Sequence, residues 1–547
     1  MNRFILCLFV LLAGCVASPA HAVKGLWVHP ERVIDKATAD KTLGQAQRCG
    51  VDNLYVLIFN GGNAWFRTPQ WHMSPNVKDG FDPLGYCIDA GHKRGMNVHA
   101  WFINGKMGTA ERDRHPEWQA ENAQGGKSAW YDFTKPEVRQ FQHDLMLSAV
   151  KGYPGLDGIH FDYIRFPNTS LGYGTSSVEA FRKASGYSPD EPAQLDRFPV
   201  KILLTANPIH GATTGKVLAA FGTGKPAILE NRLGAGRVLF FNWHAEISRL
   251  TLLDSFLRSK LKELGAEKRP VKLLVSERND KGYGGSSRTL AEQWLGRAGA
   301  KAVQAKLGEC SANDILVVPC IYVWNADEAS SLRKLVEGGM NVVWIDGPYV
   351  SLPGLLAIIG ADRTDDWFSA KTTITPVVED PAMPVSADTK SVDEADKQAQ
   401  AWEQWRKDRV TDLVRDVYRS AKRVRPSVIV SAAVFYTKDS ADGVLQDWPR
   451  WVREGYVDYV IPMAYAGDSA LESAFGEWER LPHWRERVIP GLSIYTRTNG
   501  VIGPRPADEV RRQVDICAKH GANGMVVFCC HYISPETEVV LKSASGK

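Results

Sequence analysis

Eight short apolar segments that alternate with amphipathic segments constrain the fold of this chain more than any other feature. The predicted strands cover residues 24–30, 53–60, 96–104, 158–166, 427–435, 457–465, 488–495 and 524–529. Helical patterns such as 82–95, 135–153 and 506–521 lie between them, and glycine or proline closes each one. Eight strands, each followed by a helix or by room for one, predict a (β/α)8 TIM barrel of the α/β class.

The interval between the fourth and fifth strands is too long for a crossover helix, since it holds about 260 residues. Residues 199–375 have their own alternation of strands and helices, and segments with the composition of linkers, 185–199 and 372–396, flank them. We therefore expect the barrel to be interrupted after strand 4 by an inserted α/β domain. The expected boundaries are 23–190 for the first half of the barrel, 191–391 for the insert and 392–547 for the second half.

The first 22 residues have the pattern of a secretory signal peptide, with Arg3, an apolar run over 4–13 and a small-residue end at Ala22. Two cleavage sites fit this pattern. Ordinary signal peptidase would cut after Ala22, whereas "LAGC" resembles a bacterial lipobox with cleavage before Cys15 and lipidation of that residue. Both alternatives predict an exported protein, either in the periplasm or on the outer membrane as a lipoprotein. No later segment has 18 consecutive apolar residues, so no spanning helix is expected.

Charge and cysteine content exclude several classes of partner and cofactor. The formal net charge is +4 over 547 residues, and no basic run has interleaved aromatics, so no nucleic-acid partner is expected. Seven cysteines follow the signal segment, and an odd number cannot all pair within one chain. Because the chain has no Cys-x-x-Cys motif, neither a redox motif nor a zinc site is supported. We expect no metal and no cofactor.

The segment "GLDGIHFDYIRFP" places two polar side chains in a strand that otherwise reads as buried. Strand side chains alternate between faces, so His160 and Asp162 share one face and Ile159 and Phe161 share the other. The apolar face must meet the surrounding helices, which leaves the polar face pointing into the barrel. The same alternation places further side chains inside the barrel at Trp27, His29, His99 and Trp101. Barrel enzymes build their sites at the C-terminal ends of such strands, so these residues predict an active-site mouth.

Tryptophans suggest the class of ligand. Six of them lie within or just after the first three strands: Trp27, Trp65, Trp71, Trp101, Trp118 and Trp130. Flat indole rings at a barrel mouth are suited to stacking on sugar rings, although about half of these residues are expected to be core packing.

Several segments resemble the bacterial glycosyl hydrolase-like 10 family, among them "KGLWVHP", "DGIHFDYIRFP" and "QDWPRWVREGYVDYVIPMAY". The resemblance covers residues 23–185 and 395–535. It implies a secreted or lipid-anchored TIM-barrel glycosidase with Asp162 in the signature strand, and some members act on peptidoglycan strands stripped of their peptides. The insert resembles class I glutamine amidotransferase-like modules, but Cys320 lacks the glycines of a nucleophile elbow, so we expect it to be non-catalytic.

Hydrolysis of a glycosidic bond normally needs two carboxylates, and Asp162 is the first candidate. Asp447 is the preferred second one, with Asp132 and Glu31 as alternatives. The same strand also resembles that of family 18 chitinases, but Ile164 stands where their catalytic glutamate would be. Either Asp162 takes the acid role itself or another loop supplies the acid. The residues expected to bind the polysaccharide substrate are Trp27, His29, Asn60, His99, Trp101, Asn104, His160, Tyr163, Arg165, Tyr465 and Tyr495.

Two other functions are compatible with the sequence. One is a non-catalytic glycan-binding or envelope-scaffold lipoprotein. The other is a metal-dependent barrel hydrolase, because His29, His99 and His160 approach the same mouth as Asp162. Amidohydrolase barrels, however, need a His-x-His motif on the first strand, where this chain has "WVHP".

The lipobox predicts that a lipid on Cys15 attaches the protein to the membrane. If Cys15 is the lipidated residue, Cys15→Ala should move the protein from the membrane fraction to the soluble periplasm without changing its fold. Cell fractionation with immunoblotting measures this, and N-terminal sequencing locates the cut. A mature N-terminus at Val23 would exclude lipidation of Cys15.

Overall fold

The computed structural model describes residues 22–78, 80–123, 125–187, 189, 198–206, 209–245, 250–279, 283–319, 324–345, 353–364, 368–385, 390–498 and 501–544. Cys15, nearly all of the predicted signal peptide, and Cys320 lie outside these residues. Within the described part, no helix is both long enough and apolar enough to cross a membrane.

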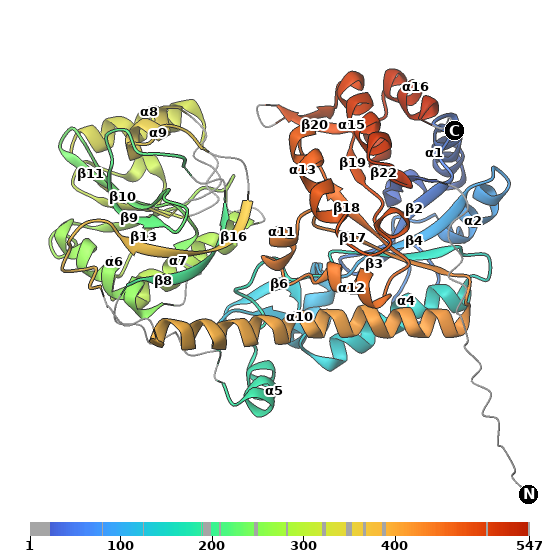
Figure 1. Ribbon diagram of the computed structural model, residues 1–547, viewed down its shortest axis with the longest axis horizontal. Helices are drawn as coiled ribbons and strands as arrows, with labels where there is room; N and C mark the ends of the chain where they lie inside the picture. Colours follow the sequence, from blue (N-terminus) through green and yellow to red (C-terminus); the bar gives the residue numbers. More distant parts are fainter. Residues whose placement is uncertain are drawn as a thin grey trace, which may run out of the picture.

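Eight parallel strands form a closed barrel, which confirms the predicted TIM-barrel fold (Figure 1). In the order around the barrel they are β1 (Val23–Val28), β2 (Asn53–Asn60), β4 (Asn97–Ile103), β7 (Gly158–Asp162), β17 (Ile429–Val434), β18 (Tyr459–Ala464), β19 (Gly491–Ser493) and β22 (Gly524–Phe528). The pairing of β22 with β1 closes the sheet. Each of these strands falls within one of the eight segments expected from the sequence, or within one residue of it.

Helices surround the barrel strands. The main ones are α1 (Lys36–Arg48), α2 (Pro83–His92), α4 (Pro136–Gly152), α10 (Lys390–Val424), α12 (Trp448–Glu454), α13 (Asp468–Trp478), α15 (Ala507–Lys519) and α16 (Pro535–Ser543). Short elements fill the loops at β3 (Asn63–Ala64), α3 (Thr109–Arg114), β5 (Gln119–Glu121), β6 (Lys127–Tyr131), α5 (Thr175–Ser185), α11 (Lys438–Asp442), α14 (Trp484–Arg487), β20 (Tyr495–Thr498) and β21 (Val501–Pro504).

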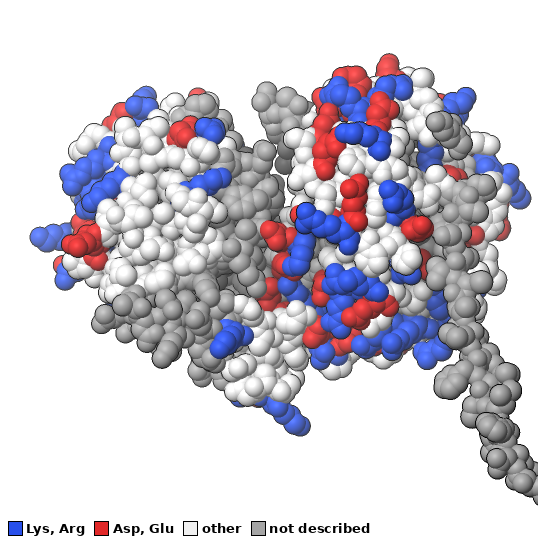
Figure 2. Space-filling view, viewed as in Figure 1, with Lys and Arg blue, Asp and Glu red and all other residues white. Residues whose placement is uncertain are grey.

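The long helix α10 packs against α4. In the view of Figure 1 it runs below the barrel and below the part of the chain that contains β8 to β16. Its buried residues recur at helical spacing, at Val410, Leu413, Val414, Val417 and Ala421. An ion pair between Asp408 of α10 and Arg450 of α12 joins these two helices. Basic and acidic side chains are mixed over the barrel side of the face in Figure 2. Neither sign of charge dominates the described part of that face.

The barrel strands contribute to two separate apolar cores. Ile159 and Phe161 belong to the outer core, between the strands and the helices. Trp27, Tyr55 and Trp101 belong to the inner core, inside the barrel. The alternation of the sequence therefore assigned the two faces of these strands correctly.

Residues 200–376 contain a second sheet of nine strands, which lie in the chain between β7 and β17. Its order is β13 (Val303–Ala305), β12 (Val271–Leu274), β14 (Ile315–Val318), β15 (Asn341–Ile345), β11 (Gly236–Phe241), β10 (Pro226–Leu233), β9 (Lys216–Phe221), β16 (Phe368–Pro376) and β8 (Val200–Ala206). The strands from β13 to β11 are parallel, and those from β11 to β8 are antiparallel.

Helices cover both faces of this second sheet. Residues of α6 (Thr251–Glu263) and α7 (Tyr283–Arg297) share one apolar core with the sheet. Residues of α8 (Ala326–Glu337) and α9 (Pro353–Ile359) share a second core on the other face. The result is a three-layer α/β arrangement with cores of its own.

Glycine at position 158 is required by the packing inside the barrel. His99 and Gly158 are register neighbours on β4 and β7, and a Cβ atom at 158 would lie 2.1 Å from His99 Nδ1. The buried His99 ring also stacks on Tyr55 with ring centroids 4.7 Å apart. Its Nε2 is paired with Asn53 Oδ1 at 2.9 Å, so the ring cannot move aside without loss of these contacts.

Gly158→Ala is therefore expected to destabilise the protein by at least about 1–3 kcal/mol, the usual cost of overpacking a core. Gly152→Ala is the matched control, because Gly152 is helical and a Cβ atom there meets nothing within 4 Å. Chemical denaturation of both variants measures the difference. Equal stability of the two variants would contradict this account of the barrel interior.

Candidate active site

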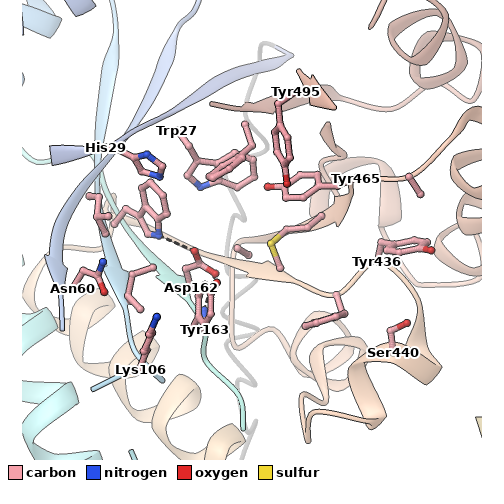
Figure 3. Close-up of a pocket in the computed structure, with 18 residues that line it drawn as sticks. Trp27, His29, Asn60, Lys106, Asp162, Tyr163, Tyr436, Ser440, Tyr465 and Tyr495 are labelled. Atoms are coloured by element: carbon pink, nitrogen blue, oxygen red, sulfur yellow. Dashed lines mark hydrogen bonds between the residues drawn. The ribbon is translucent and has the colours of Figure 1, made fainter. Parts of the chain in front are cut away.

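A pocket of about 630 Å³ opens at the C-terminal ends of the barrel strands (Figure 3). Aromatic rings and aliphatic side chains form most of its wall, with a few polar groups among them. The residues that line it are Trp27, His29, Leu57, Asn60, Trp101, Ile103, Lys106, Asp162, Tyr163, Ala433, Phe435, Tyr436, Ser440, Met463, Tyr465, Ala466, Tyr495 and Phe528.

Asp162 is the last residue of β7 and is 5% exposed. Its Oδ2 accepts a hydrogen bond from Trp101 Nε1 at 3.1 Å, and its Oδ1 accepts one from the backbone N–H of Tyr163 at 2.7 Å. The second bond accompanies an uncommon backbone conformation, because Tyr163 has a φ of 52°. Gly105 allows this turn to pack closely, since a Cβ atom at 105 would lie 2.3 Å from the Tyr163 carbonyl oxygen.

Burial determines the protonation of Asp162. It raises the pKa of this carboxyl to about 6, and the Tyr163 N–H, the Arg165 charge and the Trp101 N–H offset only part of the effect. Burial and the nearby Asp162 charge also raise the pKa of Tyr465, which keeps its hydroxyl protonated. The pocket therefore combines a carboxyl that can carry a proton in weakly acidic conditions with a neutral hydroxyl close to it.

The structure does not bring any of the expected second carboxylates to Asp162, because none of them lines the pocket. Asp447 is the N-cap residue of α12. Asp132 is fully buried and accepts a hydrogen bond from the Thr134 N–H at 3.0 Å. Glu31 pairs with His531 at 2.7 Å. Asp162 is the only carboxyl among the described residues that line the pocket.

Of the eleven residues expected to bind substrate, seven line the pocket: Trp27, His29, Asn60, Trp101, Tyr163, Tyr465 and Tyr495. These side chains come from different strands and loops, and Figure 3 shows His29, Trp27 and Asp162 on one side and Tyr465 and Tyr495 on the other. Aromatic rings on opposite walls suit the apolar C–H faces of a sugar ring.

His160 and His99 were expected at the mouth but lie deeper in the barrel. His160 Nε2 accepts a hydrogen bond from Trp27 Nε1 at 3.1 Å, which leaves Nδ1–H to donate to Ser431 Oγ at 2.9 Å. Complete burial holds the pKa of His160 well below its usual range. His99 is paired with Asn53 at 2.9 Å. Period-two alternation gives the face of a strand residue but not its depth, which explains the misplacement.

Asn104 and Arg165 lie behind the pocket wall. The Asn104 amide is buried and paired with Gln142 at 2.8 Å. The Arg165 guanidinium packs over the rings of Tyr163 and Phe435 at 4.7 and 4.9 Å from their centroids. Both residues support the wall rather than line it.

Sequence reasoning missed several lining residues, notably Lys106, Tyr436 and Ser440. Lys106 follows β4, Tyr436 follows β17, and Ser440 lies in α11. These residues could have been predicted from their position just after barrel strands, because the site of a TIM barrel is built from the loops that follow its strands. Lys106 is the one Lys or Arg among the described lining residues.

A sequence model of the glycosyl hydrolase-like 10 family matches residues 23–199 and 361–496, more than half of the chain. The chain belongs to this family. The match includes Asp162, most of the barrel and β16, and it leaves out the other eight strands of the second sheet.

Curated relatives resemble part of the chain. "Glycosyl hydrolase DigH" of Escherichia coli is 29% identical over 180 residues, which cover 28% of this chain and 40% of the relative. "Glycosyl hydrolase YngK" of Bacillus subtilis is 26% identical over 180 residues, which cover 28% of this chain and 34% of the relative. The chain therefore spans less than half of the length of these relatives.

Among solved structures, the glycoside hydrolase domain of PgaB (BpsB) from Bordetella bronchiseptica aligns with a TM-score of 0.49 and 9% identity. That alignment covers 96% of this chain and 99% of the other. A likeness at this level does not bear on function.

The raised pKa of Asp162 predicts a pH-dependent stability. Because the folded protein binds this proton more tightly than the unfolded chain, ionisation costs stability as pH rises from the ordinary pKa of 3.8 toward about 6. The whole pKa shift, from 3.8 to about 6, corresponds to a loss of about 3 kcal/mol in the free energy of unfolding. About 2 kcal/mol of this loss develops between pH 4.5 and pH 7.5.

Asp162→Asn removes this dependence. The free energy of unfolding of the variant minus that of wild type should be larger by about 2 kcal/mol at pH 7.5 than at pH 4.5, because wild type is destabilised at the higher pH and the variant is not. Urea unfolding at the two pH values measures this difference. If the stability difference between variant and wild type were the same at both pH values, the prediction would be wrong. Such a constant difference is what the loss of one hydrogen-bond acceptor alone would cause.

Proposed function

We propose that this protein is an exported glycoside hydrolase that cleaves a cell-envelope polysaccharide, with peptidoglycan glycan strands as its substrate. Membership of the glycosyl hydrolase-like 10 family and relatives named as glycosyl hydrolases support the reaction class. The observation that carries the proposal is the Asp162 carboxyl, buried at an aromatic-lined barrel mouth with its pKa raised to about 6.

In the proposed reaction, Asp162 is the general acid. It gives its proton to the glycosidic oxygen as the bond to the anomeric carbon breaks, and burial supplies the protonated form near pH 6. Trp101 Nε1 and the Tyr163 N–H hold the two carboxyl oxygens and stabilise the carboxylate that remains. Trp27, Tyr465 and Tyr495 supply aromatic faces for the sugar rings.

As the glycosidic bond breaks, a nucleophile must form a new bond to the anomeric carbon, and the described pocket lining offers no second carboxyl. Some glycosidases use the 2-acetamido group of the substrate instead, which attacks its own anomeric carbon before water completes hydrolysis. Peptidoglycan sugars carry this group. The single carboxyl therefore favours a 2-acetamido sugar substrate, and the Lys106 ammonium suits the carboxylate of a muramic acid residue.

We further propose that the segment with the second sheet is an inserted, non-catalytic domain of the glutamine amidotransferase-like class. Its helix-covered sheet with two cores of its own supports an independent unit, and the family match omits residues 200–360. Export, and attachment to the outer membrane through Cys15, are parts of the same proposal.

A non-catalytic glycan-binding protein would use the same aromatic pocket, and catalysis distinguishes the two functions. With peptide-free peptidoglycan strands, Asp162→Asn should lower the cleavage rate by a factor of at least about 10². The rate of the wild-type protein should fall as pH rises through about 6, because the proton donor is then lost. Product release is measured by liquid chromatography with mass spectrometry.

Asp157→Asn is the matched control. Asp157 lies just before β7, where it accepts a hydrogen bond from the Val98 N–H at 2.8 Å, and it does not line the pocket. This variant should keep the wild-type rate at equal folded concentration. Wild-type protein that binds these strands and releases no product would exclude the enzymatic function.

A further inference from the structure

Three side chains with metal-ligating atoms converge at the pocket rim, where β1 and β22 end. They are His29, Cys529 and His531, and one ligand atom of each lies within 4.8 Å of the others. Their convergence depends on barrel closure, because the pairing of β1 with β22 brings two chain segments about 500 residues apart in the sequence to one edge.

The distances suit a tetrahedral ion. Cys529 Sγ lies 3.5 Å from His531 Nδ1. A zinc ion with its sulfur ligand at about 2.3 Å and its nitrogen ligand at about 2.0 Å holds those two ligands about 3.5 Å apart. The rings of His29 and His531 have centroids 5.2 Å apart, which leaves room for an ion between them.

Glu31 supplies the outer contact that metal-binding histidines commonly have. Its Oε1 lies 2.7 Å from His531 Nε2 and 3.9 Å from His29 Nδ1. A proton on His531 Nε2 that is donated to this carboxylate leaves Nδ1, the nitrogen facing Cys529, with a free lone pair. The carboxylate thus selects the tautomer that binds metal.

The charge of the cluster and its exposure to solvent also suit a divalent cation. A Cys529 thiolate and the Glu31 carboxylate together balance the charge of a divalent cation. Cys529 is 1% exposed, whereas the side chains of His29 and His531 are 28% and 26% exposed. The cluster is therefore closed on the sulfur side and open to solvent on the histidine side, which gives an ion a path to enter.

We propose that His29, Cys529 and His531 bind one Zn²⁺ ion, with Glu31 as the outer-shell partner of His531. Three protein ligands leave a fourth position for water or for an oxygen of a bound ligand. His29 also lines the pocket and stacks on Trp101 with centroids 5.5 Å apart, so the ion would lie at the rim of the substrate pocket. This site stands independently of the proposed glycosidase function.

Zinc binding to the full-length protein tests the proposal. After metal removal and reduction, titration with Zn²⁺ should give one bound ion per chain by calorimetry and by elemental analysis. Cys529→Ser and His531→Ala should each weaken binding by at least about 10-fold, and Glu31→Gln by about 10-fold or more. Co²⁺ in place of Zn²⁺ should give a thiolate-to-cobalt absorption band that Cys529→Ser abolishes.

Cys517→Ser is the matched control for loss of one thiol, because Cys517 is a buried free cysteine on α15. This variant should keep both the affinity and the cobalt band. Circular dichroism establishes that each variant is folded, and Glu31→Gln tests the site without removal of a ligand. Absence of stoichiometric zinc binding by the wild-type protein, or a cobalt band that persists in Cys529→Ser, would overturn the proposal.

Discussion

The parallel pairing of β7 with β17 is the contact on which the rest of the structure depends. These strands are neighbours in the barrel, although the chain between them contains a whole second sheet. A barrel strand without its neighbour would leave a row of buried N–H and C=O groups unpaired. The chain must therefore return to the barrel after the second sheet, and α10 provides that return as it packs along α4.

Closure also creates an interior that only specific side chains can fill. Trp27 and Trp101 both point inward, and each donates its indole N–H to a different acceptor. Trp27 bonds His160, which is neutral and part of the packed interior, whereas Trp101 bonds Asp162 at the pocket floor. Two chemically similar contacts thus have different consequences, because of the two acceptors only Asp162 lines the pocket.

The pocket and the proposed metal cluster occupy adjoining parts of one rim. The pocket floor has one described carboxyl, so the proposed chemistry relies on the substrate for its nucleophile. The metal cluster instead comes from the strand ends that close the barrel and from the residues directly after β22. His29 belongs to both groups, which places a ligand for a cation within reach of whatever occupies the pocket.

The barrel fold, the inward faces of its strands and the position of Asp162 could be predicted from the sequence. Period-two alternation fixed which faces of β1, β4 and β7 point inward, and the eight-strand count fixed the barrel, because burial of apolar faces leaves few other arrangements. Asp162 was identified as a pocket residue since it ends a strand with a polar inner face.

Tertiary structure decided the rest. The depth of His99 and His160, the separation of Asp447 from Asp162 and the approach of Cys529 to His29 depend on strand stagger and loop path. The sequence pattern determines the face on which a residue lies, because faces follow from local backbone geometry. It does not determine which distant residues meet, because that follows from how the barrel closes.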